Sequence, residues 1–357
     1  MSTILIAPDS FKGSLTSVQV AQGLADGWRR ARHEDEILLC PLADGGEGTL
    51  AAIEAAGGWT WQESTVRDPI GRPIRARWLR SADGLRAVVE MAEASGLSRL
   101  RPDERDPIGA TSVGTGELLA AAIDAGVRHV TLGIGGSATT DGGQGLLDGL
   151  LAGDRRLDDV VLEVACDVSN PLLGPTGAAA TYGPQKGATP DDVAMLDTRN
   201  AAWADTLEAR EGRRERETPG AGAAGGVGFA LLAIQDRFRS FALRPGVELL
   251  MDATEFDARL ARADLVLTGE GRIDAQTGFG KTALGVAKRA QAAGVPCIAV
   301  GGGVEPAGID ALAAVGAVAM PVVERPQSVE QAMSAGVAPL ERCGERLARL
   351  ASIDLVR

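Results

Sequence analysis

Three segments of the sequence place acidic side chains among glycines, hydroxyls or basic residues. They contain Asp9, Ser10, Lys12 and Ser14 (residues 7–14), Asp44, Gly45, Gly46 and Glu47 (residues 43–49), and Glu270 and Arg272 (residues 268–274). Each segment follows a short apolar run that favours a strand, and ligands of open parallel sheets bind beyond the carboxyl ends of strands. One acidic loop alone is more often a turn, but three of them favour a magnesium–nucleotide site, because phosphoryl transfer needs positioning and charge neutralisation.

A fourth segment, residues 132–143, is the best candidate phosphate loop. It offers backbone donors, hydroxyls and a carboxylate through Gly135, Gly136, Ser137, Thr139 and Asp141. A glycine-rich loop between a strand and a helix suits a phosphate or a polyol. Its first part also fits the dinucleotide fingerprint G-x-G-x-x-A, although no βαβ unit with a suitably spaced acid is expected after it. An NAD(P)-dependent oxidoreductase of a small hydroxy acid therefore remains an alternative.

Three further polar residues have weaker signals. Lys281 begins a predicted helix, but a P-loop would need glycine at position 275, where the chain has Ala275. Lys281 is then either a phosphate contact or a solvated surface lysine. Asp167 follows a predicted strand and Lys186 lies among turn-forming residues, so each belongs either to a site or to an ordinary turn.

Alternating strands and helices at both ends of the chain predict parallel βαβ units. Strands are expected over 3–7, 37–42, 263–268, 295–300 and 315–322, and helices after a capping box at Thr16–Gln19, over 50–56 and over 282–293. The middle differs. It predicts a hairpin from strands 75–80 and 86–91, helices over 117–125 and 191–210, and strands over 128–132 and 160–166.

These patterns predict an α/β fold with two α/β domains. Residues 1–67 and 246–357 are expected to form one discontinuous open α/β domain with a parallel sheet. Residues 68–245 are expected to form an inserted mixed α/β domain. Because the chain crosses twice between them, the active site is expected in a cleft between the two domains.

Composition excludes several classes of function. The 357 residues carry 36 basic and 48 acidic side chains, a net charge of −12, which argues against a nucleic-acid partner. No apolar run is long enough to cross a membrane, and no leader is evident, so a cytoplasmic location is expected. The four cysteines lack metal-binding spacing and are interpreted as free thiols, and His33 and His129 cannot complete a zinc site with them.

The ordered motifs of the chain resemble the type I glycerate kinase family along essentially its whole length. They are IAPDSFKGSLTS (6–17), PLADGGEGT (41–49), EMAEASGL (90–97), TSVGTGELL (111–119), GIGGSATTDGG (133–143), EVACDVSNPL (163–172), GPQKGATP (183–190), PGAGAAGG (219–226) and LTGEGRIDAQT (267–277). The resemblance implies ATP-dependent phosphorylation of D-glycerate to 2-phosphoglycerate or 3-phosphoglycerate with Mg²⁺. It also implies two α/β domains, one flavodoxin-like and discontinuous. The segment over 145–160 is shorter than the family pattern.

A glycerate kinase must bind a carboxylate, activate a hydroxyl and shield a phosphoryl group, and these needs suggest roles for the residues. Asp44 is the predicted base or hydroxyl-orienting group, with Asp9 as its competitor. Lys12 and Arg272 are predicted to bind the substrate carboxylate or the transferring phosphate. The remaining predictions are substrate binding by Ser10, Ser14, Gly45, Gly46 and Glu47, ATP binding by Gly135, Gly136, Ser137, Thr139, Asp141, Lys186 and Lys281, and Mg²⁺ binding by Asp167 and Glu270. A non-catalytic glycerate-binding homologue is a further alternative.

Overall fold

The computed structural model describes residues 1–43, 45–46, 48–275, 277 and 282–353, and it divides into two compact units. The terminal unit consists of residues 1–44, 51–57 and 250–357, and the inserted unit of residues 45–50 and 58–249. The second stretch of the inserted unit starts at Gly58, whereas the expected boundary lay after Arg67. The reason is that strand β3 (Trp59–Arg67) pairs along its length with β4 (Pro73–Ser81) of that unit.

The terminal unit is built on a parallel sheet of five strands in the order β11-β10-β9-β1-β2. The strands are β1 (Thr3–Ile6), β2 (Glu36–Leu39), β9 (Leu265–Ile273), β10 (Cys297–Val304) and β11 (Ala317–Pro321). Read by chain position, this is the flavodoxin-like strand order, and it confirms the expected fold class. The order reverses between β1 and β9, so the carboxyl ends of these two strands mark the switch point at which ligands of such sheets bind.

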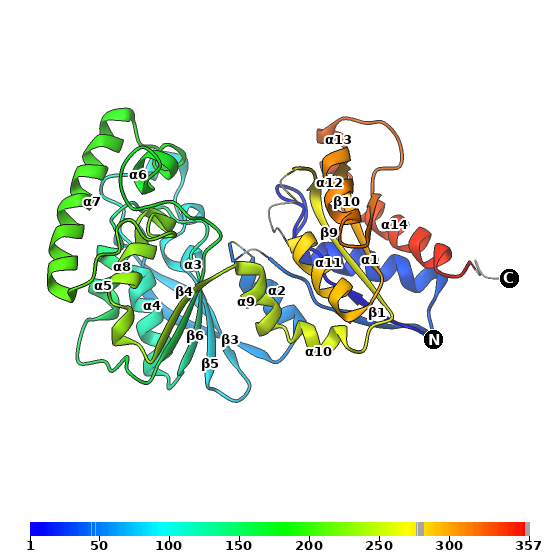
Figure 1. Ribbon diagram of the computed structural model, residues 1–357, viewed down its shortest axis with the longest axis horizontal. Coiled ribbons are helices and arrows are strands. Elements are labelled where there is room, and N and C mark those ends of the chain that lie inside the picture. The colour runs from blue at the N-terminus through cyan, green and yellow to red at the C-terminus, as the bar shows by residue number, and fades with distance from the viewer. Residues whose placement is uncertain (44, 47, 276, 278–281, 354–357) are drawn as a thin grey trace. The chain divides into compact units, whose positions relative to one another are not determined.

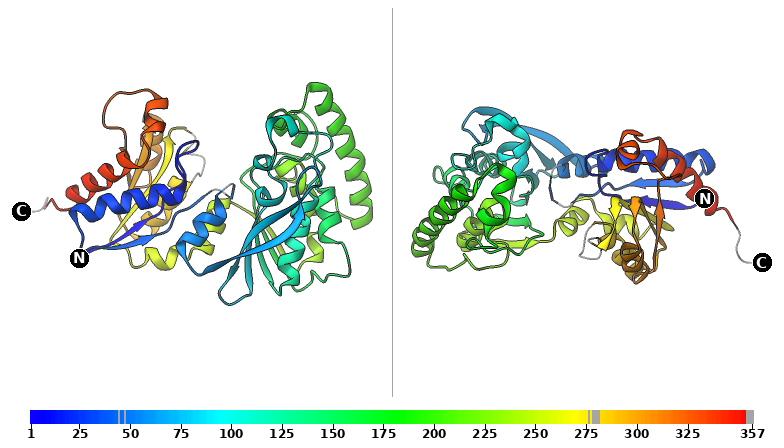
Figure 2. Two further views of the ribbon diagram at one scale, coloured as in Figure 1. Left: turned by 180° about the vertical axis from the view of Figure 1, so that it is seen from behind. Right: turned by 90° about the horizontal axis from the view of Figure 1, so that it is seen from above.

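Helices cover both faces of this sheet. The right-hand view of Figure 2 shows α1 (Ser17–Ala31) and α14 (Ala338–Leu350) on one face, and α11 (Thr282–Ala293) and α12 (Pro306–Ala313) on the other. The core of the first layer joins Leu24 and Trp28 of α1 to Leu340 and Leu347 of α14. The expected capping box is present, since Gln19 N–H donates to Thr16 Oγ1 at 3.2 Å. The other helices with residues in this unit are α2 (Thr49–Ala56), α9 (Gly246–Ala253), α10 (Phe256–Leu260) and α13 (Val329–Ser334).

Strands β9 and β10 continue beyond their expected ends at Thr268 and Val300. The pairing extends to Gly301 opposite Glu270 and Gly303 opposite Arg272. The prediction that residues 269–273 form a loop was therefore wrong. Glycine has a weak propensity for strands. Here the two glycine-rich segments pair with each other, and the backbone hydrogen bonds between them stabilise the strand conformation. Glu270 and Arg272 consequently stand on a strand.

The inserted unit has a mixed sheet of six strands in the order β3-β4-β5-β6-β7-β8. The strands after β3 are β4 (Pro73–Ser81), β5 (Arg86–Glu90), β6 (His129–Gly133), β7 (Val161–Ala165) and β8 (Ser240–Arg244). Pairs among β3, β4 and β5 are antiparallel, which confirms the expected hairpin, and those from β5 to β8 are parallel. The carboxyl ends of β5, β6, β7 and β8 therefore share one edge of the sheet.

A single large core joins this sheet to a layer of helices. Figure 1 shows α4, α5, α7 and α8 gathered beside the strands, and Leu132 and Val164 of the sheet share a core with Leu118, Leu146 and Phe229 of the helices. The helices of the unit are α3 (Met91–Ser95), α4 (Val113–Asp124), α5 (Gln144–Leu150), α6 (Ala178–Tyr182), α7 (Pro190–Glu211) and α8 (Val227–Ala233).

The strand before the candidate phosphate loop and the strand over 160–166 are present as predicted. β6, α5 and β7 form a parallel βαβ arrangement. The short connection from α5 to β7 still contributes Leu157 and Val160 to the core, so packing is maintained there. None of the helices in the described part of the chain combines the length and apolar character needed to cross a membrane.

Candidate active site

A pocket of about 700 Å³ lies at the switch point of the terminal unit. Asp9 and Lys12 line it from the segment after β1, Glu270 and Arg272 line it from β9, and Thr282 lines it from the first residue of α11. The structure thus brings together two of the acidic segments that the sequence singles out. Ser10 and Ser14 also line the pocket.

The carboxylates of this pocket are held by hydrogen bonds. Asp9 accepts the Ser10 N–H at 2.6 Å and the Thr282 hydroxyl at 2.7 Å, one on each carboxylate oxygen. Glu270 is buried, with 7% of its surface exposed, and accepts the Thr277 hydroxyl at 2.7 Å. These bonds orient both carboxylates. The bond from Thr282 places Asp9 at the first residue of α11, where the positive end of the helix dipole stabilises negative charge.

Arg272 is engaged with neighbouring acids. Its guanidinium pairs with Glu305 and lies 3.5 Å from Asp274, and the hydrogen bond with Glu305 raises the pKa of Arg272. The side chain is 67% exposed at the pocket rim. An anion bound there would share Arg272 with two carboxylates, which weakens its predicted role as a dedicated carboxylate ligand.

A second cluster forms at the carboxyl edge of the inserted sheet. A Cβ atom on Gly135 would lie 2.6 Å from the Cα of Gly46, and one on Gly45 would lie 2.5 Å from the Cβ of Ala165, at the end of β7. Neither position has space for a side chain, and Gly45 also has a left-handed φ of +83°. The predicted substrate segment and the predicted phosphate loop are therefore in direct backbone contact.

Glu90 fixes the same segment from the end of β5. The carboxylate is 4% exposed and accepts the Leu50 N–H at 2.7 Å, near the N-terminus of α2. A carboxylate at a helix N-terminus accepts a hydrogen bond from a backbone N–H that has no acceptor within the helix. Its negative charge is also stabilised by the helix dipole. Glu90 lies in the EMAEASGL motif but received no role from the sequence, because one glutamate gives no signal that separates a helix cap from a surface residue.

The polar side chains of residues 137–141 are mostly used inside the protein. Asp141 accepts the Ser112 N–H and hydroxyl, each at 2.8 Å, and the N–H groups of Gly143 and Gly145. Ser137 is buried and forms a backbone bridge with Gly96. Gly135 is partly accessible and Gly136 is exposed, so the loop presents mainly backbone to a ligand.

Three side chains donate hydrogen bonds to backbone carbonyls of this loop. Lys186 is 1% exposed and donates to the Thr139 carbonyl at 2.5 Å, Arg199 donates to the Thr140 carbonyl at 3.0 Å, and Trp203 donates to the Gly142 carbonyl at 3.1 Å. The Thr139 hydroxyl is buried and has no hydrogen-bond partner within the part of the chain that the structure describes. The predicted ATP ligands Thr139 and Lys186 thus face the interior.

The two predicted metal ligands lie in different units. Asp167 follows β7 in the inserted unit and accepts the Gly246 N–H at 3.0 Å, whereas Glu270 belongs to the terminal unit. Among the described residues, no three His, Cys, Asp or Glu side chains gather into a metal site. Asp44, Glu47 and Lys281 lie outside the described residues.

The prediction of free thiols agrees with the structure. All four cysteines are free, three of them buried and Cys166 half-buried. His129 pairs with Glu163 at 2.7 Å, and the exposed His33 lies beside Glu34.

Comparison with known proteins identifies the family to which the chain belongs. The chain matches the model of the glycerate kinase family over residues 4–153 and 149–352, two stretches that meet within the segment expected to be short. It is 42% identical to a glycerate kinase of Halalkalibacterium halodurans over 99% of each chain, and 39% identical to a glycerate 2-kinase of Escherichia coli over 84% of each. A crystal structure assigned as a glycerate kinase 2 from Salmonella typhimurium LT2 matches with a TM-score of 0.84, at 39% identity and 98% coverage of each chain. The chain therefore belongs to the glycerate kinase family.

Proposed function

We propose that this protein transfers the γ-phosphoryl group of ATP to a hydroxyl of D-glycerate. The observation that carries the proposal is the pocket at the switch point, where Asp9, Lys12 and Glu270 converge at the head of α11. Carboxylates, a cation and a helix N-terminus in one pocket supply the positioning and charge neutralisation that phosphoryl transfer needs. The names of the relatives specify the acceptor as glycerate.

The relative named glycerate 2-kinase favours 2-phosphoglycerate as the product. In the reaction, the glycerate hydroxyl oxygen forms a bond to the γ-phosphorus as the bond to the ADP oxygen breaks, and the hydroxyl proton passes to a base. Asp44 is the proposed base or orienting group, and Asp9 remains its competitor. Lys12 is proposed to neutralise the phosphoryl oxygens during transfer.

Magnesium is proposed to enter together with the nucleotide. Mg²⁺ prefers oxygen ligands and is usually held by one or two carboxylates plus substrate phosphates, and the carboxylates of Asp9 and Glu270 in the pocket fit that donor set. When bound, the ion neutralises charge on the transferring phosphoryl group. Direct binding by Asp167 remains a separate prediction.

The test is turnover of purified protein with ATP, Mg²⁺ and D-glycerate. We expect ADP to form only when glycerate is present, and phosphorus NMR of the product to show 2-phosphoglycerate; the 3-phosphate would reassign the acceptor hydroxyl. Absence of ADP above background would contradict the proposal. In that case, glycerate binding without turnover would favour the non-catalytic homologue, and thermal protection by NAD(P)H but not by Mg·ATP would favour the oxidoreductase.

An active site in a cleft between the two units and a cytoplasmic location both remain predictions. The first can be tested by a double-mutant cycle between Lys12 of the terminal unit and Glu90 of the inserted unit. Strongly non-additive effects on turnover would indicate that residues of both units act on the same reaction.

A further inference from the structure

We propose that the switch-point pocket of the terminal unit binds the adenine nucleotide, with the base against an apolar wall built from α13 and Phe11. The proposal rests on the kinase function proposed above and assigns its nucleotide substrate to the switch-point pocket. The sequence predicts the ATP phosphates on residues 135–139 of the inserted unit instead. Four features of the two sites, argued in turn, favour the terminal unit.

The first feature is an exposed apolar wall on one side of the pocket. Val329 and Met333 of α13 line the pocket together with Phe11 and Ala332. Val329 is 75% exposed and Met333 is 40% exposed, so both side chains are accessible to a ligand in the pocket. They are four positions apart on α13, so they share one face of the helix. An aromatic base is the part of ATP that would cover such a surface.

The second feature is the polar part of the lining of the same pocket. Asp9, Lys12 and Glu270 line it together with Thr282, the first residue of α11, a helix of 12 residues. Backbone N–H groups at a helix N-terminus favour phosphate. One pocket thus offers an apolar surface for the base and polar groups for the phosphates of a nucleotide.

The third feature is the balance of charge. Four carboxylates line the pocket, those of Asp9, Glu270, Asp274 and Glu305, against the two cations Lys12 and Arg272. Arg272 is already shared by Glu305 and Asp274. A free glycerate anion would be repelled by this set of acids. If the nucleotide brings Mg²⁺ with its phosphates, the same carboxylates would serve as ligands of the ion instead of repelling the phosphates.

The fourth feature is size. A volume of about 700 Å³ lies within the range of pockets for drug-sized ligands, about 300–1,000 Å³, and greatly exceeds the needs of a small hydroxy acid. The edge of the inserted sheet has the opposite character. Gly135 and Gly136 present backbone there, while Thr139 and Lys186 are buried and Asp141 accepts six internal hydrogen bonds. That edge suits a small anion such as glycerate.

Photolabelling tests the assignment directly. Irradiation of the intact protein with 8-azido-ATP and Mg²⁺, followed by peptide mass spectrometry, should place the label on residues 11–14 or 329–333 and be prevented by excess ATP. Label on residues 133–143 would overturn the proposal. This readout needs no turnover. A protein that is labelled as expected but makes no ADP would refute the kinase function while leaving the nucleotide site intact.

Substitution of the apolar wall is the second test. Met333→Glu and, separately, Val329→Glu should raise the KM for ATP by about 10-fold or more, the scale on which apolar pockets discriminate ligands, and leave the KM for glycerate within about two-fold. Val329→Glu guards against misfolding, because the residue is 75% exposed in the first turn of α13, where an acid is favourable. The matched control is Met195→Glu on α7, which is 57% exposed and far in sequence from the pocket. An unchanged KM for ATP in both α13 variants, or a changed KM for glycerate alone, would overturn the proposal.

Discussion

At the scale of single residues, Lys186 combines complete burial with a role in holding a loop. Its ammonium donates to the Thr139 carbonyl, and burial lowers the pKa of Lys186 to about 7. In the unfolded chain a lysine titrates near pH 10.4. The native protein therefore releases this proton at a lower pH than the unfolded protein, and the charged form of Lys186 costs stability below pH 7.

This difference predicts that Lys186 makes the protein more stable as the pH rises from 7 towards 10. In that window the unfolded state binds more protons, so the free energy of unfolding increases with pH. The wild type should gain about 1–2 kcal/mol over Lys186→Met between pH 7 and pH 8.5. Denaturant titrations at both pH values measure it. A wild-type-minus-variant difference that stays constant with pH would contradict the assignment.

Asp44 is the residue predicted to accept the proton of the glycerate hydroxyl or to orient that hydroxyl. Asp44→Asn keeps the size of the side chain but cannot take a proton from the glycerate hydroxyl. We expect turnover to fall by about 10²-fold or more, the usual scale for a lost acid–base group, with an unchanged melting temperature. Near-normal turnover would move the role to Asp9, and Asp9→Asn is then the decisive variant. Steady-state kinetics with ATP and glycerate varied separately distinguish a loss of kcat from a change in KM.

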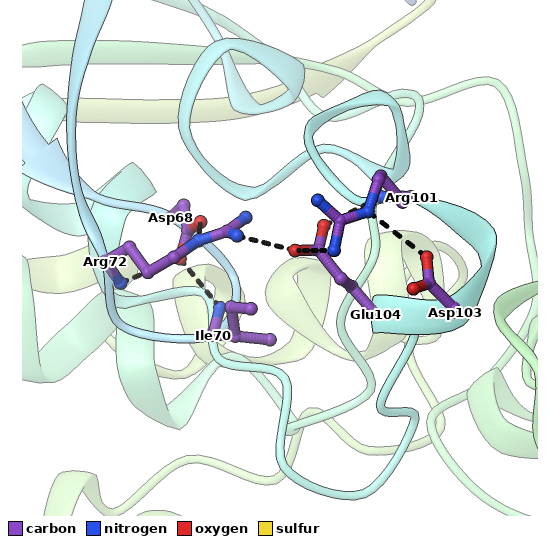
Figure 3. A network of polar contacts seen from close by, with 6 residues as sticks. All are labelled: Asp68, Ile70, Arg72, Arg101, Asp103 and Glu104. Carbon is purple, nitrogen blue, oxygen red and sulfur yellow. Dashed lines mark hydrogen bonds and ion pairs between the residues drawn. The ribbon is translucent and has the colours of Figure 1, made fainter.

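At the scale of elements, the turn between β3 and β4 depends on one buried acid. Asp68 is 1% exposed and accepts the N–H groups of Ile70 and Arg72 at 3.0 and 2.8 Å and the Arg72 guanidinium at 2.5 Å. Figure 3 shows this network extending to the segment that starts at Arg101; its members are Asp68, Ile70, Arg72, Arg101, Asp103 and Glu104.

Removal of the acid should therefore destabilise the inserted unit. Asp68→Ala leaves several donors without an acceptor, and we expect the free energy of unfolding to fall by about 2–3 kcal/mol. The matched control is Asp103→Ala in the same network, where the side chain is 74% exposed and pairs only at the surface. That variant should change stability by less than about 0.5 kcal/mol. Equal effects of the two substitutions in chemical denaturation would show that the turn does not depend on Asp68.

The elements that the sequence predicts well are those with strong local signals. The capping box at Thr16, the helix from Thr282 to Ala293 and the hairpin around Asp83 follow from capping residues, helical spacing and a turn. The extension of β9 to Ile273 was missed because its cause is not local. Residues 269–273 form a strand through their pairing with the distant segment 301–304.

The same contrast applies to the site. Glycine and acidic patterns identify Asp9, Lys12 and Glu270, which the structure brings to one pocket. They do not reveal that Asp141 and Lys186 are used inside the inserted unit, since a polar residue in a loop looks the same in sequence whether it faces solvent or interior. Nor do they identify Val329 and Met333, which have the residue types of an ordinary core and are recognisable only by their exposure.

At the scale of the whole molecule, the net charge of −12 sets a condition on nucleotide binding. ATP without a metal is strongly anionic, and the carboxylates that line the switch-point pocket repel it at short range as the rest of the acidic protein does at longer range. If Asp9 and Glu270 hold Mg²⁺ as proposed, the ion would offset most of the short-range repulsion between the phosphates and the carboxylates. Binding of ATP should therefore depend on Mg²⁺ even when no reaction takes place.

We expect chelation of Mg²⁺ by EDTA to weaken ATP binding by about 10-fold or more in calorimetry without glycerate, a change of about 1.4 kcal/mol or more. The remaining affinity of metal-free ATP should improve when salt is raised from about 0.01 M to about 0.1 M, because the screening length falls from about 30 Å to about 10 Å and the long-range repulsion with it. Glu270→Gln is the diagnostic variant: it removes one carboxylate, so it should reduce the preference for the magnesium complex by weakening Mg·ATP and strengthening metal-free ATP. If salt instead weakens the binding of metal-free ATP, then Lys12 and Arg272 outweigh the acids that line the pocket, and the neutralising role given to magnesium is wrong.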